Sequence, residues 1–199
     1  MADARSREPP KELKMRSVFL LLLCIVSAVS LPAKEKPPVT YRIPLPPKPD
    51  FSPLEWLVGE WTGKTTGRGP QGEIHLSVSY DLDKRFMIFR EQVSLAATAA
   101  VPASDEAWLG ILSADRSGTG LVLRTYSSTG FITRYRMSVG EEQVSFNPEG
   151  GEQTPPGWLV RRVLQRSGDA ELIETVQMAP PNRPFFDYYT AVLARKSSQ

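Results

Sequence analysis

Arginine side chains inside segments that look like β-strands are the residues of this sequence best suited to binding a charged group. They are Arg90, Arg124, Arg134, Arg136, Arg161 and Arg162, and a guanidinium prefers planar, bidentate partners such as carboxylates and phosphates. Arg124 and Tyr126 are two residues apart and therefore share one face of a strand. We hypothesise that this pair, with Arg134 or Arg136 from the next strand, holds an anionic head group inside the domain. An outward-facing pair is the equal alternative.

His75 and Tyr135 complete the set of predicted ligand-binding residues. His75 is the single histidine of the chain and shares its strand face with Ser77, which is typical of a polar residue at the surface or lining a pocket. Without a second histidine or a cysteine near it, a zinc site is not expected. Tyr135 shares one strand face with Phe131 and Met137, so it belongs either to the core or to a pocket wall.

Four carboxylates offer an alternative chemistry, that of a general acid and base pair. They are Glu91, Glu171, Glu174 and Asp187. We expect solvated strand faces and cross-strand ion pairs with the arginines instead. No Gly-x-Ser-x-Gly nucleophile motif occurs, so the sequence predicts no catalytic residues and no enzyme.

Ten short segments must position these residues, each with apolar or aromatic residues on alternate positions. They are 60–66, 72–81, 85–95, 106–113, 119–127, 130–139, 142–147, 157–166, 171–178 and 185–195. Turn residues separate them at hairpin spacing, and closure of the meander removes its two exposed edges. The predicted fold is therefore all-β, a ten-stranded antiparallel up-and-down β-barrel. A short helix over 51–58 precedes it, with Ser52 as its cap and Pro53 at its first position. The loop at 95–104 is either a lid or an extra strand.

The N-terminus, residues 1–30, has the organisation of a secretory signal peptide. Basic residues precede an apolar run at 18–29, and small residues follow it. The run is shorter than the roughly 20 residues of a spanning helix, so we expect an exported protein, periplasmic or secreted, with no stable membrane span after cleavage. A lipoprotein anchored through Cys24 is the less favoured alternative, and Met15 is an alternative start to Met1.

A proline-rich linker at 31–50 separates this segment from the predicted barrel domain at 51–196. Residues 31–199 contain 19 basic and 19 acidic groups, whereas a nucleic-acid-binding domain normally has a basic excess. Nucleic acid is therefore not expected as a partner. Because Cys24 is the only cysteine, no disulfide stabilises the domain. The oligomeric state is left open.

The entry of the domain, FSPLEWLVGEWTGKTTG at 51–67, contains Gly59 and Trp61 in a Gly-x-Trp arrangement. It resembles the entry of calycin-type barrels such as lipocalins and fatty-acid-binding proteins, and more closely that of the nitrobindin-like haem-binding barrels and related bacterial domains of unknown function. The resemblance implies that Trp61 packs under the barrel floor and that Arg195 of the last strand covers it, a cation–π pair that closes the barrel.

The sequence departs from the nitrobindin-like pattern at the haem ligand. In those barrels a histidine near the C-terminal strands ligates the iron, whereas residues 183–195 read RPFFDYYTAVLAR here. A haem iron would need His75, Tyr188 or Tyr189, with tyrosinate as the ligand in the last two cases. We therefore predict no haem and no other cofactor.

Two functions from different classes fit these observations. The first is an exported, non-catalytic barrel that binds a small hydrophobic or amphipathic molecule, with an anionic one as an option. The second is a structural or protein-interaction barrel of the cell envelope whose interior is filled by side chains. An empty interior lined by aromatic residues would favour the first.

Overall fold

The computed structural model describes residues 41–43, 45–67, 70–99, 102–118, 120–153 and 156–197. The chain divides into two compact units, Met1–Pro44 and Leu45–Gln199. In the first unit only residues 41–43 are described, and they are exposed and form neither helix nor strand. The predicted signal peptide and most of the predicted linker lie outside the described residues.

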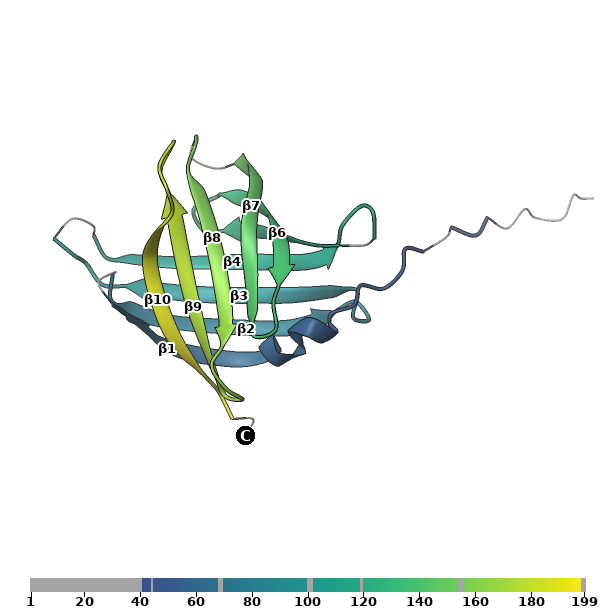
Figure 1. The fold of residues 1–199 in the computed structure, drawn as a ribbon, viewed down its shortest axis with the longest axis horizontal. Coiled ribbons are helices and arrows are strands. Elements are labelled where there is room, and N and C mark those ends of the chain that lie inside the picture. Colours follow the sequence, from purple (N-terminus) through teal and green to yellow (C-terminus); the bar gives the residue numbers. More distant parts are fainter. Residues whose placement is uncertain are drawn as a thin grey trace, which may run out of the picture. The chain divides into compact units, whose positions relative to one another are not determined.

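The second unit is a β-barrel preceded by one short 3-10 helix, η1 (Ser52–Leu57). Its strands are β1 (Gly59–Thr66), β2 (Gly72–Asp81), β3 (Phe86–Leu95), β4 (Ser104–Ala114), β5 (Leu121–Ser127), β6 (Ile132–Val139), β7 (Gln143–Gln153), β8 (Leu159–Arg166), β9 (Glu171–Ala179) and β10 (Phe186–Arg195). Each strand pairs antiparallel with its neighbours in sequence, and β1 pairs with β10 to close the barrel (Figure 1). The predicted fold class is confirmed. In the part of the chain that is described, no helix has the length and apolar character needed to cross a bilayer.

The barrel closes around the contact between Trp61 and Arg195, which pair across β1 and β10. The guanidinium carbon of Arg195 lies 4.2 Å from the centroid of the Trp61 ring. Its two terminal nitrogens donate to the carbonyl oxygens of Val58, at 2.5 Å, and Trp56, at 2.7 Å. Gly59 is necessary here, because a Cβ at its φ of +141° would lie 2.6 Å from Nη1 of Arg195. The three residues that the resemblance assigned to barrel closure are therefore in contact.

Helix η1 is fixed by its apolar side chains and not by the predicted cap. Leu54 and Leu57 are fully buried, and the indole nitrogen of Trp61 donates to the carbonyl of Leu57 at 2.8 Å. The prediction that Ser52 caps the helix is wrong, because no side-chain cap bond forms and the Ser52 amide instead donates to the carboxylate of Asp50 at 2.9 Å.

Two segments predicted as loop or spacer belong to the barrel unit. Residues 45–50 lie against it, with Lys48 paired to Asp83 at 2.6 Å and Arg85 donating to the carbonyl of Pro46 at 3.0 Å. Strand β7 continues to Gln153, six residues past its predicted end at 147, because it stays paired with β6 through two register shifts. Between β3 and β4 the described residues of the predicted lid form no strand.

The end of the barrel beside η1 is filled with apolar side chains. The largest fully buried ones there and in the centre include Trp61, Phe89, Phe146, Leu76 and Met87. The rings of Phe89 and Phe146 pack edge to face with centroids 5.7 Å apart. Burial of these side chains stabilises a domain that has no cysteine after residue 24.

Candidate ligand-binding cavity

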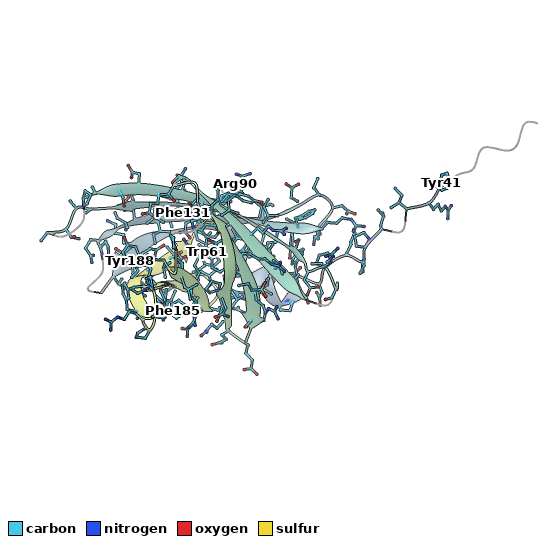
Figure 2. All side chains as sticks on the ribbon, turned by 90° about the horizontal axis from the view of Figure 1, so that it is seen from above. Tyr41, Trp61, Arg90, Phe131, Phe185 and Tyr188 are labelled. Atoms are coloured by element: carbon cyan, nitrogen blue, oxygen red, sulfur yellow. The ribbon has the colours of Figure 1, made fainter. Side chains whose placement is uncertain are left out.

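The opposite end of the barrel encloses a cavity of about 320 Å³. It lies where β3, β5, β7 and β9 end and where β4, β6, β8 and β10 begin, as its lining residues show. Its aromatic lining residues are Trp108, Phe131, Tyr135, Trp158, Tyr188 and Tyr189; Phe131 and Tyr188 are labelled in Figure 2. A volume of this size is at the lower end of the range for small-molecule sites.

The cavity exists because β7 and β8 separate at this end. They pair over Gln143–Phe146 and Arg162–Gln165. Beyond that point β7 follows β6 and β8 follows β9, so residues of both strands, among them Pro148 and Val160, line the cavity. Proline has no backbone N–H to give to a neighbouring strand, which favours the separation at this position.

A β-bulge adds a second tyrosine to the cavity wall. Successive residues of a regular strand point to opposite faces, yet Tyr188 and Tyr189 both line the cavity. The register between β9 and β10 shifts between Asp187 and Tyr189, which is how a bulge redirects a side chain. The two rings lie 5.7 Å apart and form one continuous aromatic surface.

Below the aromatic walls lies a buried polar cluster built around Arg162 of β8. Its Nη1 atom lies 2.8 Å from Oε1 of Glu174 on β9 and 3.0 Å from Oε1 of Glu91 on β3. The hydroxyl of Tyr189 on β10 lies 3.4 Å from the same Glu91 oxygen and can donate to it. Arg162 and Tyr189 line the cavity and the two glutamates do not, so the cluster presents its guanidinium and a phenol to the cavity.

The guanidinium of Arg162 also packs against the indole ring of Trp108 on β4. The guanidinium carbon of Arg162 lies 4.4 Å from the centroid of the indole ring, and the indole stacks on Phe89 with centroids 6.3 Å apart. The indole nitrogen of Trp108 is buried and, among the described residues, has no hydrogen-bond partner. Buried indole N–H groups are usually paired, so this donor is an exception in the barrel interior.

Burial governs the protonation of the cluster. It raises the pKa of Glu174 well above the usual value for a carboxyl, and the neighbouring charge of Glu91 raises it further. Burial likewise raises the pKa of Tyr189 well above its ordinary value, with the charges of Glu174 and Glu91 acting in the same direction. For Arg162 burial alone would lower the pKa, but the neighbouring Glu91, Tyr189 and Glu174 outweigh it and raise that pKa. These shifts favour the charged form of the guanidinium and the neutral forms of the phenol and of the Glu174 carboxyl.

The expectation of solvated strand faces and ion pairs with arginines is confirmed in part: Glu91 and Glu174 do pair with an arginine, Arg162, but these two carboxylates are not solvated. Glu171 and Asp187 are exposed, whereas Glu91 is 1% exposed and Glu174 is fully buried. The sequence contained the signal: Glu91 is the single polar residue on the strand face that Met87, Phe89, Val93 and Leu95 form, and Glu174 interrupts a similar apolar face on β9. A charged residue on an apolar face needs an opposite charge inside the barrel. Arg162 is a candidate for that charge, because it shares one strand face with the apolar residues Val160 and Leu164.

The cavity contains one of the five residues predicted to bind the ligand, Tyr135. Arg124, Tyr126, Arg134 and His75 have exposed side chains on the outer face of the barrel. The hypothesis that Arg124 and Tyr126 hold a head group inside is therefore not supported, because the buried neighbours that alternate with them, Leu123 and Thr125, occupy the inner face.

The outer arginines have partners of their own. Arg134 and Arg136 both bind Glu149, Arg134 through its Nε at 3.1 Å. Arg90 is exposed on the outer face of β3 and is labelled in Figure 2. Arg162 is one of the six arginines in predicted strands. Because apolar residues lie on both faces of its segment, the alternation of apolar and polar residues did not predict whether its side chain points inward or outward.

The described residues do not fit a haem. His75 faces outward, and burial raises the pKa of both Tyr188 and Tyr189, which opposes the tyrosinate that an iron would require. In the described part of the chain, no three histidine, cysteine, aspartate or glutamate side chains gather as a metal site would need.

Comparison with known proteins supports the fold. No family model matches the sequence, and no curated protein matches it. Among solved structures, the crystal structure of Rv2717c from M. tuberculosis is similar, with a TM-score of 0.54 and 20% sequence identity. The match covers 74% of this chain and 97% of that one. A similarity at this level of identity shows the barrel fold and not a function.

Proposed function

We propose that this chain is an exported, non-catalytic, calycin-like barrel that binds a small hydrophobic or amphipathic molecule in its interior. The observation that carries the proposal is the cavity of about 320 Å³ whose walls are aromatic and whose inner end is the Arg162 cluster. Ligand sites combine apolar walls with a few convergent polar groups in this way. Export is inferred from the N-terminal sequence.

The distribution of polar groups gives the ligand an orientation. Phe131, Trp158 and Leu159 line the cavity and are also each about 40% exposed, so they form its mouth. Arg162 and Tyr189 lie at the inner end. An amphipathic ligand would therefore enter with its polar group first and leave its apolar part between the aromatic side chains.

The packed half of the barrel supports this function without taking part in it. Trp61, Leu76 and Met87 are almost completely buried, and together with the Arg195 contact they keep that end closed. A structural barrel with a filled interior, the alternative function, would be expected to be packed in this way along its whole length.

Native mass spectrometry and thermal shift of the purified protein test the proposal. The panel consists of decanoic acid, decan-1-ol and an isoprenoid alcohol. We expect at least one of them to bind in a ratio of one to one and to raise the unfolding temperature. Val160 lines the cavity, so Val160→Trp should fill part of it and abolish the shift.

The matched control is Val192→Trp on the outer face of β10, where Val192 is 37% exposed. This variant introduces the same side chain without touching the cavity and should bind as the unchanged protein does. Loss of binding in both variants, or a protein that binds no member of the panel, would favour the structural barrel with a protein partner.

A further inference from the structure

The two glutamates of the polar cluster compete for one cation. Glu91 and Glu174 both place Oε1 against Nη1 of Arg162. The second carboxylate oxygen of each, Oε2, is buried and finds no hydrogen-bond partner in the described part of the chain. If both carboxylates were ionised, the cluster would have a net charge of −1 in a region from which water is excluded, and such a charge is costly.

One proton removes this charge. Burial and the neighbouring Glu91 raise the pKa of Glu174 well above the normal range, so Glu174 is the carboxyl that retains it. With that proton in place, the one negative charge that remains on the carboxyl pair is balanced by Arg162, and the cluster is neutral. The other titratable groups that face it are the phenols of Tyr189 on β10 and Tyr135 on β6, and burial raises the pKa of both, so they contribute no charge.

On its cavity side the cluster offers donors. Arg162 and Tyr189 both line the cavity, and their side chains carry N–H and O–H donors. A guanidinium fits a carboxylate through paired N–H bonds, and bonds to an ionised acceptor are about twice as strong as those to a neutral one. The donors therefore favour a head group with two acceptor oxygens over a hydroxyl or an ester.

An ionised acid entering this neutral region would bring back the net charge of −1. The charge is avoided if one proton from solvent enters with it, either onto the carboxyl pair or onto the acid itself, since these groups would share Arg162. The total charge of the occupied cluster is the same in either case. A neutral head group would enter without a proton.

We propose that the cavity binds amphiphiles with a carboxylic acid head group at Arg162, and that each ionised acid enters together with one proton taken up at the Glu91–Arg162–Glu174 cluster. This inference rests on the proposed ligand-binding function. It makes uptake favourable in acidic surroundings and release favourable as the pH rises.

Isothermal titration calorimetry with decanoic acid and decan-1-ol tests the inference between pH 6.5 and 8.5. Titration in two buffers of different ionisation enthalpy counts the protons. We expect about one proton taken up per molecule of acid, and a Kd for the acid that increases about tenfold per pH unit. The Kd of the alcohol should not change with pH.

Glu91→Gln/Glu174→Gln removes the two carboxyls and keeps the side-chain volumes. In this variant the acid should bind without proton uptake, and its Kd should no longer depend on pH. Glu171→Gln, on the exposed face of β9, is the matched control and should keep the full dependence. If the double variant does not fold, the number of protons taken up by the unchanged protein per molecule of acid still tests the inference.

The outcomes separate this inference from the proposed function. Binding of the alcohol alone, or binding of the acid with no proton taken up, overturns the inference and leaves the ligand-binding function standing. A pH dependence that persists in a folded double variant also overturns it. If neither compound binds and no other member of the panel does, both proposals fail.

Discussion

Glu91 and Glu174 lie on strands β3 and β9, and each places a carboxylate oxygen within 3.0 Å of the same nitrogen of Arg162. The strands come from different parts of the chain, and barrel closure brings them together. The contact lies at the inner end of the aromatic-lined cavity. The stability of the barrel therefore depends on how the buried charges of this cluster are balanced.

Stability should fall with rising pH because of Glu174. Its pKa is raised in the folded protein and has the ordinary value of about 4.3 in the unfolded chain. Between these values the unfolded state releases a proton that the folded state keeps, so the contribution is full below the unfolded pKa and is lost as pH rises toward the folded one. The loss is at most about 1.4 kcal/mol per pH unit.

Urea unfolding of the unchanged protein and of Glu174→Gln from pH 5 to 8 measures this contribution. The difference in unfolding free energy between them should move in favour of the variant as the pH rises. Glu171→Gln, which alters an exposed carboxyl of the same strand, should show no such trend. A constant difference across the range would mean that Glu174 is ionised in the folded barrel.

Removal of the central cation should be strongly destabilising. Arg162→Met leaves two buried carboxyls without their shared partner, and breaking a buried ion pair in this way costs about 3–5 kcal/mol. Adding Glu91→Gln and Glu174→Gln to the same protein removes the uncompensated groups and should recover most of the loss. Chemical denaturation of the single and triple variants checks this, and equal stabilities would show that the cluster is not a buried charge network.

The seam between the first and last strands should depend on Arg195. Arg195→Ala removes the cation–π contact with Trp61 and two hydrogen bonds to carbonyls at the end of η1, a loss of about 1–3 kcal/mol. Gly59→Ala should destabilise as well, because the new Cβ meets the guanidinium. In the double variant, Gly59→Ala with Arg195→Ala, this collision is absent. Its loss of unfolding free energy should therefore be smaller than the sum of the two single losses. A double-mutant cycle by thermal unfolding measures the coupling.

Outer and inner arginines should differ in their effect on binding. Arg124→Ala changes an exposed side chain and should leave the Kd for decanoic acid unchanged. Arg162→Lys retains the charge at the end of the cavity but loses the planar fork, and should weaken binding by about tenfold or more. Calorimetry on both variants distinguishes them, and the reverse order would place the ligand on the outer face.

Local pattern was sufficient for the architecture. Alternation of apolar residues and the turns between them predicted each strand from 60–66 to 185–195, and β2 has the predicted bounds, Gly72–Asp81. The main misses involve pairing at longer range, since β7 is extended by its register shifts with β6. The Ser52 cap failed for a local reason, because Asp50 supplied the acceptor.

The sequence by itself determined the ten alternating strands and favoured their closure, and its resemblance to calycin-type barrels implied that Gly59, Trp61 and Arg195 meet at the seam. Only the tertiary structure decided which strand faces look inward. That choice depends on every strand at once: Arg162 is tolerable inside because Glu91 and Glu174 arrive from β3 and β9 to balance it. Arg124 lies outside because Leu123 and Thr125 fill the inner face of its strand. The charge inside the closed barrel depends on residues from strands that are distant in the sequence. The pattern of a single strand therefore cannot predict which charged residues point inward.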